Sequence, residues 1–160
     1  MTGGIELDIT EGRKAPAFDM ATDGGGRVSL PGLKGKKVVL FFYPKADTPT
    51  CTNEAQAFSA LADDFAAAGA VIIGVSRDPV RKLDRFKARY DLKVVLASDE
   101  PEDVTDRWGV WVQKKLYGRE YMGIERATFL IDGAGVVRRV WRKVSVKGHA
   151  AEVLAAAQSL

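Results

Sequence analysis

Cys51 is the only cysteine of this 160-residue chain, and its position favours chemistry at the sulfur. It follows Thr48 and Pro49. Threonine is a favoured N-cap and proline suits the first helical position, so a helix is predicted to begin here. Cys51 would then lie in the first turn, where unpaired backbone N–H groups and the helix dipole favour a thiolate. Because its neighbours are polar, we expect this loop to face solvent.

A buried strand is predicted immediately before that helix. Residues 36–43 (KKVVLFFY) form an apolar run without alternation, typical of a strand covered on both faces. Reactive groups collect at the carboxyl ends of parallel strands in open α/β sheets, which is where Cys51 would lie. The alternative is that Cys51 is a small buried hydrophobic residue, as many free cysteines are.

The residue types that are missing narrow the chemistry open to this thiol. A cysteine hydrolase needs a histidine base, and the only histidine, His149, is expected to be an exposed residue at the start of the last helix. A second cysteine, a zinc ligand set and a dinucleotide fingerprint are also missing, so we expect no cofactor and no metal. The reaction that remains is attack of a lone thiolate on the O–O bond of a peroxide, which gives a sulfenic acid.

Alternating strand and helix patterns predict an α/β fold in one domain, residues 1–160. Strand, helix, strand, helix, strand implies parallel pairing through right-handed crossovers, and an antiparallel hairpin follows. The glycine-rich stretch 23–27 is expected to be a turn between two short strands. The expected elements are a helix within 50–68, a strand at 69–76, a helix after Pro79, a strand at 93–98, a short helix near 102–108, a hairpin at 126–141 and a helix at 150–158.

Composition limits the partners and the location. The formal charge of +3 comes from 24 basic and 21 acidic residues that are mixed along the chain, so nucleic acid is not expected as a partner. No apolar stretch is long enough to span a bilayer, and the first residues lack the basic start and apolar block of a secretory signal. A lone thiol also fits a reducing compartment, so we expect a cytoplasmic protein without a membrane partner.

The string 43–58 (YPKADTPTCTNEAQAF) resembles the peroxiredoxins, specifically the bacterioferritin-comigratory or PrxQ group. The P-x-x-x-T-x-x-C signature of that group is met by Pro44, Thr48 and Cys51. Segments 71–78, 114–132 and 136–154 are similar to PrxQ segments in the same order. The resemblance implies a thioredoxin-like fold, a mixed sheet flanked by helices with an extra N-terminal β-hairpin.

The resemblance also implies a thiol peroxidase that reduces hydrogen peroxide and organic hydroperoxides. Cys51 would be the peroxidatic cysteine, and Thr48 would offer its hydroxyl to the sulfur and the peroxide. Pro44 would shield the pocket from water. Arg126 would stabilise the thiolate and polarise the peroxide, and Glu54 would orient Arg126.

The chain departs from the family where many members carry a resolving cysteine. Gln56 stands at one such position and Lys87 at the other, so no internal disulfide can form. An external thiol would have to reduce the Cys51 sulfenic acid. The expected reductants are thioredoxin, glutaredoxin or glutathione, and the expected state is a monomer or weak homodimer.

Other readings stay open. The protein could be a redox sensor that signals oxidation of Cys51 to a partner, or a thioredoxin-fold binding or chaperone module with an inert thiol. The aromatic residues Trp108, Trp111, Tyr117 and Tyr121 could line the mouth of the thiol pocket, although we favour packing for them.

Overall fold

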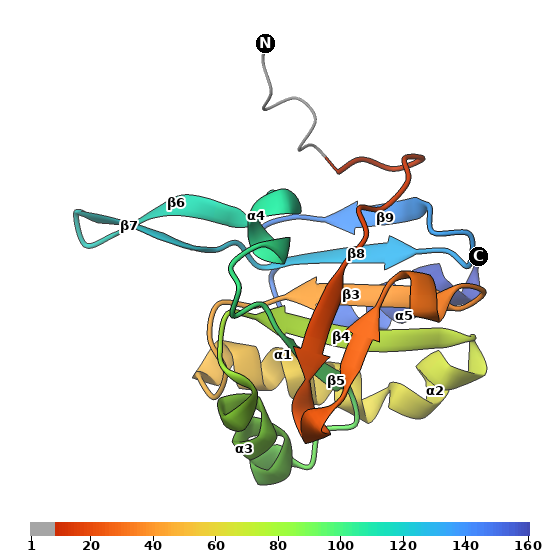
Figure 1. Cartoon of the computed structure of the whole chain (residues 1–160), viewed down its shortest axis with the longest axis horizontal. Helices are drawn as coiled ribbons and strands as arrows, with labels where there is room; N and C mark the ends of the chain where they lie inside the picture. Colours follow the sequence, from red (N-terminus) through yellow and green to blue (C-terminus); the bar gives the residue numbers. More distant parts are fainter. Residues whose placement is uncertain (1–8) are drawn as a thin grey trace.

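The computed structural model describes residues 9–160 (Figure 1). Residues 1–8, on which part of the prediction about a secretory signal rests, lie outside the described residues. Within the described range, no helix is long and apolar enough to cross a membrane.

One mixed sheet of seven strands forms the centre of the fold (Figure 1). Its three middle strands β5, β4 and β3 are parallel, and β1–β2 and β8–β9 add antiparallel hairpins at the two edges. This confirms the predicted parallel core, the C-terminal hairpin and the N-terminal hairpin. In spatial order the strands are β2 (Arg27–Ser29), β1 (Asp19–Thr22), β5 (Val95–Ser98), β4 (Ala70–Ser76), β3 (Lys37–Phe42), β8 (Ala127–Ile131) and β9 (Val137–Trp141).

Two clusters of buried side chains lie on opposite faces of the sheet, because alternate residues of β3 point to opposite sides. Val39 and Phe41 belong to the cluster covered by four helices, whereas Leu40 and Phe42 belong to the cluster that contains Trp108. The helices of the first cluster are α1 (Pro49–Ala60), α2 (Ala62–Ala67), α3 (Val80–Tyr90) and α5 (His149–Gln158); α4 (Val104–Arg107) belongs to the second.

Aromatic stacking fixes α1 against the sheet. The ring of Phe41 stacks on Phe58 of α1 with centroids 4.7 Å apart. On the neighbouring strand Phe41 pairs with Gly74, where a Cβ would lie only 2.6 Å from the Phe41 ring. Glycine at this position therefore leaves the space that the ring occupies. Phe58 in turn holds the helix that carries Cys51.

The helix expected within 50–68 is divided in two. Leu61 lies between α1 and α2 with φ −102° and ψ 11°, and its N–H binds the carbonyl of Phe58 instead of continuing the regular helix. Phe58 and Phe65 on either side both pack into the same buried cluster. The periodicity of apolar residues predicted the buried face correctly but could not reveal this change of direction.

A two-stranded arm, β6 (Trp111–Leu116) and β7 (Arg119–Ile124), projects from the body and was not predicted (Figure 1). Its two-residue turn has φ of 52° at Tyr117 and 78° at Gly118, which is the geometry of a tight hairpin turn. Tyrosine is unusual at the first of these positions, so the turn signal was weak. Core packing is confirmed for Trp108, which is fully buried, but is wrong for Tyr117 and Tyr121, which are exposed on the arm.

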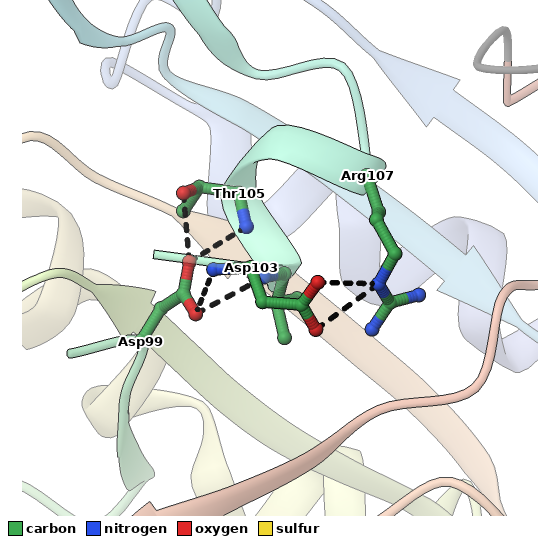
Figure 2. Close-up of polar contacts among 5 residues, drawn as sticks. Asp99, Asp103, Thr105 and Arg107 are labelled. Atoms are coloured by element: carbon green, nitrogen blue, oxygen red, sulfur yellow. Dashed lines mark hydrogen bonds and ion pairs between the residues drawn. The ribbon is translucent and has the colours of Figure 1, made fainter. Parts of the chain in front are cut away.

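A buried carboxylate fixes the helix that precedes the arm. Asp99 accepts hydrogen bonds from the backbone N–H groups of Asp103, Val104 and Thr105 and from the Thr105 hydroxyl, as Figure 2 shows. Thr105 also accepts a hydrogen bond from Nε of Arg77. These contacts satisfy the free N–H groups of the first turn of α4, and so hold the base of the arm in place.

Candidate functional site

Cys51 lies in the first turn of α1, as predicted, just beyond the carboxyl end of β3. Thr48 is the N-cap with extended backbone, and Pro49 is the first helical residue. The loop before it faces solvent at Lys45, Asp47 and Pro49, as predicted, but Cys51 itself is only 2% exposed. Its polar neighbours Thr50 and Asn53 point outward, whereas Cys51 shares the inner face of the helix with Ala55 and Phe58. Cys51 is therefore as buried as the alternative prediction, a small buried hydrophobic residue, requires.

Its contacts are those of a reactive thiol. Arg126 donates a hydrogen bond from Nη2 to Cys51 Sγ at 3.4 Å and another from Nη1 to Glu54 Oε1 at 2.6 Å. The sheet creates this meeting, because β8 is antiparallel to β3 and pairs Ala127 with Phe42. Arg126, the residue before Ala127, is thus placed beside the end of β3, from which the chain leads to Cys51.

The Arg126–Glu54 ion pair is almost entirely buried. Glu54 is 1% exposed, and burial raises its pKa to about 7, although the charge and hydrogen bond of Arg126 oppose this. Its second oxygen, Oε2, has no hydrogen-bond partner among residues 9–160. Burial also works against the charge of Arg126, but the negative Glu54 and Cys51 outweigh it and raise the pKa of Arg126. Arg126 is therefore a permanent cation that faces two acidic groups.

Thr48 and Pro44 lie in the loop between β3 and α1. The Thr48 hydroxyl does not cap the helix; it donates a hydrogen bond to the carbonyl of Lys45 at 2.8 Å. Its oxygen therefore remains available as an acceptor. Pro44 is half-buried, directly after Tyr43 at the end of the strand.

Two aspartates that the sequence analysis missed anchor this loop. The buried Asp78 accepts hydrogen bonds from the backbone N–H of Ala46 at 2.7 Å and from the Ser76 hydroxyl at 2.8 Å. Asp47, whose φ is 64°, accepts hydrogen bonds from Arg89 and from the Tyr90 hydroxyl of α3. An aspartate two residues after a predicted buried strand, as Asp78 is, was the available signal for the first of these anchors.

His149 does not have the predicted exposure. It opens α5 but is 5% exposed, and its Nε2 is hydrogen-bonded to Thr128 Oγ1 at 2.8 Å. Its ring packs edge-on against Phe58 and Trp141. Burial lowers the pKa of His149; the charge of Glu152 opposes this and that of Arg126 adds to it. The aromatic surroundings explain why a polar residue at a helix start turns inward.

The two positions without a resolving cysteine differ in environment. Gln56 is exposed on the outer side of α1. Lys87 of α3 forms an ion pair with Asp23, with Nζ and Oδ2 2.7 Å apart. Within residues 9–160, no group of three or more His, Cys, Asp or Glu side chains could hold a metal ion.

Comparison with known proteins decides the family. The model of the AhpC/TSA family matches residues 12–140. The chain belongs to this peroxiredoxin family. It is 49% identical over 148 residues to a putative peroxiredoxin bcp of Coxiella burnetii, covering 92% of this chain and 98% of the relative. It is 47% identical to peroxiredoxin Bcp of Bacillus subtilis over 92% of this chain and 94% of that one.

Solved structures agree with the sequence relatives. The bacterioferritin comigratory protein of Xanthomonas campestris superposes with a TM-score of 0.84 at 42% identity, covering 89% of this chain and 90% of that chain. PrxQ of Xylella fastidiosa gives a TM-score of 0.89 at 32% identity, covering 94% and 96%. This peroxiredoxin is therefore a thiol peroxidase with a thioredoxin-like fold, as the resemblance implied.

Proposed function

We propose that this thiol peroxidase reduces hydrogen peroxide and organic hydroperoxides through the Cys51 thiolate, which becomes a sulfenic acid. The observation that carries the proposal is the pair of hydrogen bonds from Arg126 to Cys51 Sγ and Glu54. The X. campestris relative, described for its alkyl peroxide reduction activity, supports organic hydroperoxides as substrates. We also propose that residues 1–160 form one peroxiredoxin domain.

Arg126 and Glu54 act on charge. The thiolate attacks the terminal oxygen of the peroxide, a S–O bond forms and the O–O bond breaks. The leaving alkoxide or hydroxide takes up a proton and departs as an alcohol or water. Arg126 stabilises the thiolate before attack and the oxygen on which negative charge develops during it. Glu54 holds the guanidinium in position through Nη1, which leaves Nη2 directed at the sulfur.

Thr48 and Pro44 prepare the space above the sulfur. Because the Thr48 hydroxyl proton is directed to Lys45, its oxygen can accept the hydrogen of the peroxide and so orient the O–O bond. Pro44, which carries no backbone N–H and is half-buried, shields the thiol pocket from water. Both roles depend on the fixed loop, which Asp78 and Asp47 anchor.

Reduction requires a thiol from outside, because the chain has no second cysteine. An external thiol attacks the sulfenic acid, giving a mixed disulfide and water, and a second thiol then releases Cys51 as a free thiol. Glutathione, glutaredoxin or thioredoxin can supply these thiols. A monomer or weak homodimer suffices for this cycle, because every group invoked lies on one chain.

A turnover assay tests the proposal. Hydroperoxide consumption is measured with the wild-type protein, with and without added thiol, and with Cys51→Ser as the control. We expect multiple turnovers only with wild type plus thiol. Stoichiometric peroxide gives wild type one added oxygen without an internal disulfide by mass spectrometry. One stoichiometric oxidation without turnover under any thiol would instead favour the redox sensor, and full cycles without thiol would exclude the external reductant.

A further inference from the structure

Lys114 lies on the arm at a point close to the thiol site. It pairs with Tyr121 across the β6–β7 ladder, and Gly123 lies two pairs nearer the base, opposite Val112. From Gly123 the chain continues through Ile124 and Glu125 directly to Arg126. The arm leaves the body at the end of the sheet where β3 ends (Figure 1). From that end of β3 the chain leads into α1, whose first turn carries Cys51.

The side chain of Lys114 turns toward the base of the arm. A Cβ built on Gly123 would lie 3.2 Å from Cδ and 3.5 Å from Cε of Lys114. The aliphatic stem therefore crosses the backbone of Gly123, in the space that any other residue would fill. This direction leads along β7 toward Arg126 and away from the tip of the arm.

The charges that act on Lys114 are those of the thiol site. Burial lowers its pKa and the charge of Arg126 lowers it further, while negative Cys51 and Glu125 oppose them. No hydrogen bond from a described residue contributes to this balance. The next residue, Lys115, points to the opposite face of the arm, as alternation along a strand requires, and is exposed beside its pair partner Glu120.

Oxidation changes this balance of charge. In the reduced protein the Cys51 thiolate is a negative charge that acts on both Lys114 and Arg126. The sulfenic acid is neutral, so the site becomes more positive by one elementary charge. Arg126 keeps Glu54 as its partner, whereas Lys114 loses the charge of Cys51 and keeps only that of Glu125. A partly buried ammonium in this state attracts an anion.

We propose that Lys114 selects the reductant by charge, and that the preferred reductant is a small thiol that carries carboxylates, of which glutathione is one. This inference rests on the proposed function. Lys114 holds a carboxylate of the incoming thiol while the sulfur of that thiol attacks Cys51 Sγ. The new S–S bond forms as the S–O bond breaks, and the hydroxide takes up a proton to leave as water. A second thiol molecule then reduces the mixed disulfide, so two thiols supply the two electrons.

The test uses three small thiols that differ in charge: 3-mercaptopropionate, 2-mercaptoethanol and cysteamine. Each protein is oxidised with one equivalent of hydrogen peroxide and mixed with each thiol. The loss of sulfenic acid is followed by rapid quenching and mass spectrometry, and rates are normalised to thiolate concentration. The variants are Lys114→Met, which keeps the stem, Lys114→Arg, which keeps the charge, and Lys115→Met, the matched control on the other face.

We expect wild type to prefer the anionic thiol over the cationic one. Lys114→Met should lower this anionic-to-cationic rate ratio about tenfold, in the range for electrostatic steering at a charged site. Lys115→Met should leave the ratio within about twofold, because an exposed charge on the opposite face is screened. Lys114→Arg should retain the preference, and Gly123→Ala, which displaces the stem, should reduce it. High salt should lower the ratio in wild type but not in Lys114→Met.

An unchanged ratio in Lys114→Met would overturn the inference, as would an equal loss in Lys115→Met. The rate at which neutral hydrogen peroxide oxidises Cys51, measured on the same samples, separates this failure from that of the proposed function. Normal oxidation with an unchanged ratio rejects only the role of Lys114. If wild-type Cys51 is not oxidised at all, both the proposed function and this inference are wrong.

Discussion

The buried carboxylate of Glu54 gives the stability of this protein a defined dependence on pH. Burial raises the pKa of Glu54 from an ordinary value of 4.5 to about 7. Between these values the folded protein binds a proton that the unfolded chain releases, so the free energy of unfolding falls as pH rises. At about 1.4 kcal/mol per pKa unit, the loss between pH 4.5 and pH 7 is about 3 kcal/mol. Above the folded pKa this contribution is constant.

Glu54→Gln isolates the effect, because glutamine has no proton to lose. Unfolding in urea with excess reductant, followed by tryptophan fluorescence, should be measured for both proteins from pH 4.5 to 8. We expect the free energy of unfolding of the variant to rise by about 3 kcal/mol relative to that of wild type across this range, whatever the difference between the two proteins at pH 4.5. The lowered pKa of His149 produces a slope of the opposite sign, but it is present in both proteins and cancels in the difference.

If the free energies of unfolding of the two proteins changed with pH in parallel, this reasoning would be refuted, because Glu54 would then have similar pKa values in the folded and unfolded states. A wild type that gains stability relative to the variant as pH rises would show that the attraction of Arg126 exceeds the cost of burial. In the expected case, roughly half of the molecules carry a protonated Glu54 at pH 7. The ion pair with Arg126 then strengthens on the alkaline side of neutrality.

Two further predictions concern α1. Thr48→Val keeps the shape of the side chain but removes the hydroxyl. The second-order rate constant of peroxide reduction should therefore fall about tenfold, which is about 1.4 kcal/mol of transition-state stabilisation, while the circular dichroism spectrum is unchanged. An unchanged rate constant would show that Thr48 has only a structural role. Gln56→Cys should form a partial disulfide with Cys51 after peroxide treatment and be reduced faster by thioredoxin, because the two side chains meet only when the first turns unwind. Mass spectrometry under non-reducing conditions measures the fraction of protein that carries the disulfide. Complete disulfide formation without any change in helix content would contradict the need for unwinding.

Local sequence signals predicted the scaffold of the site well. Thr48 and Pro49 determine where α1 begins through contacts within a few residues, and a glycine turn between two strand-like runs predicted the β8–β9 hairpin. The prediction failed where residues distant in sequence determine whether a side chain is buried. Cys51 has polar neighbours in sequence, but its burial depends on which face of α1 meets the sheet. His149 turns inward because Phe58 and Trp141, from other parts of the chain, surround it.

The pairing of Arg126 with Cys51 illustrates the same limit. The two residues are 75 positions apart, and only the register of β8 on β3 brings them together. No pattern near either residue contains that register, so the resemblance to a family was the only route to Arg126 from sequence. Lys114 was missed for a related reason, since its direction depends on the absence of a side chain at Gly123 on the partner strand.

The interruption at Leu61 divides the helical layer into segments that can exchange their amide hydrogens independently. A helix of the length of α1 is marginal on its own in water, so it persists mainly through the anchor at Phe58 near its C-terminal end. Its first turns, which carry Cys51, lie before that anchor, and α2 lies after the interruption. Fraying that starts at Pro49 can therefore expose the sulfur while Phe58, α2 and the sheet remain protected. The segment that must open for a bulky thiol to reach Cys51 is thus held by the contacts of Arg126 and by the loop anchor at Asp78, and not by the aromatic stacking at Phe58.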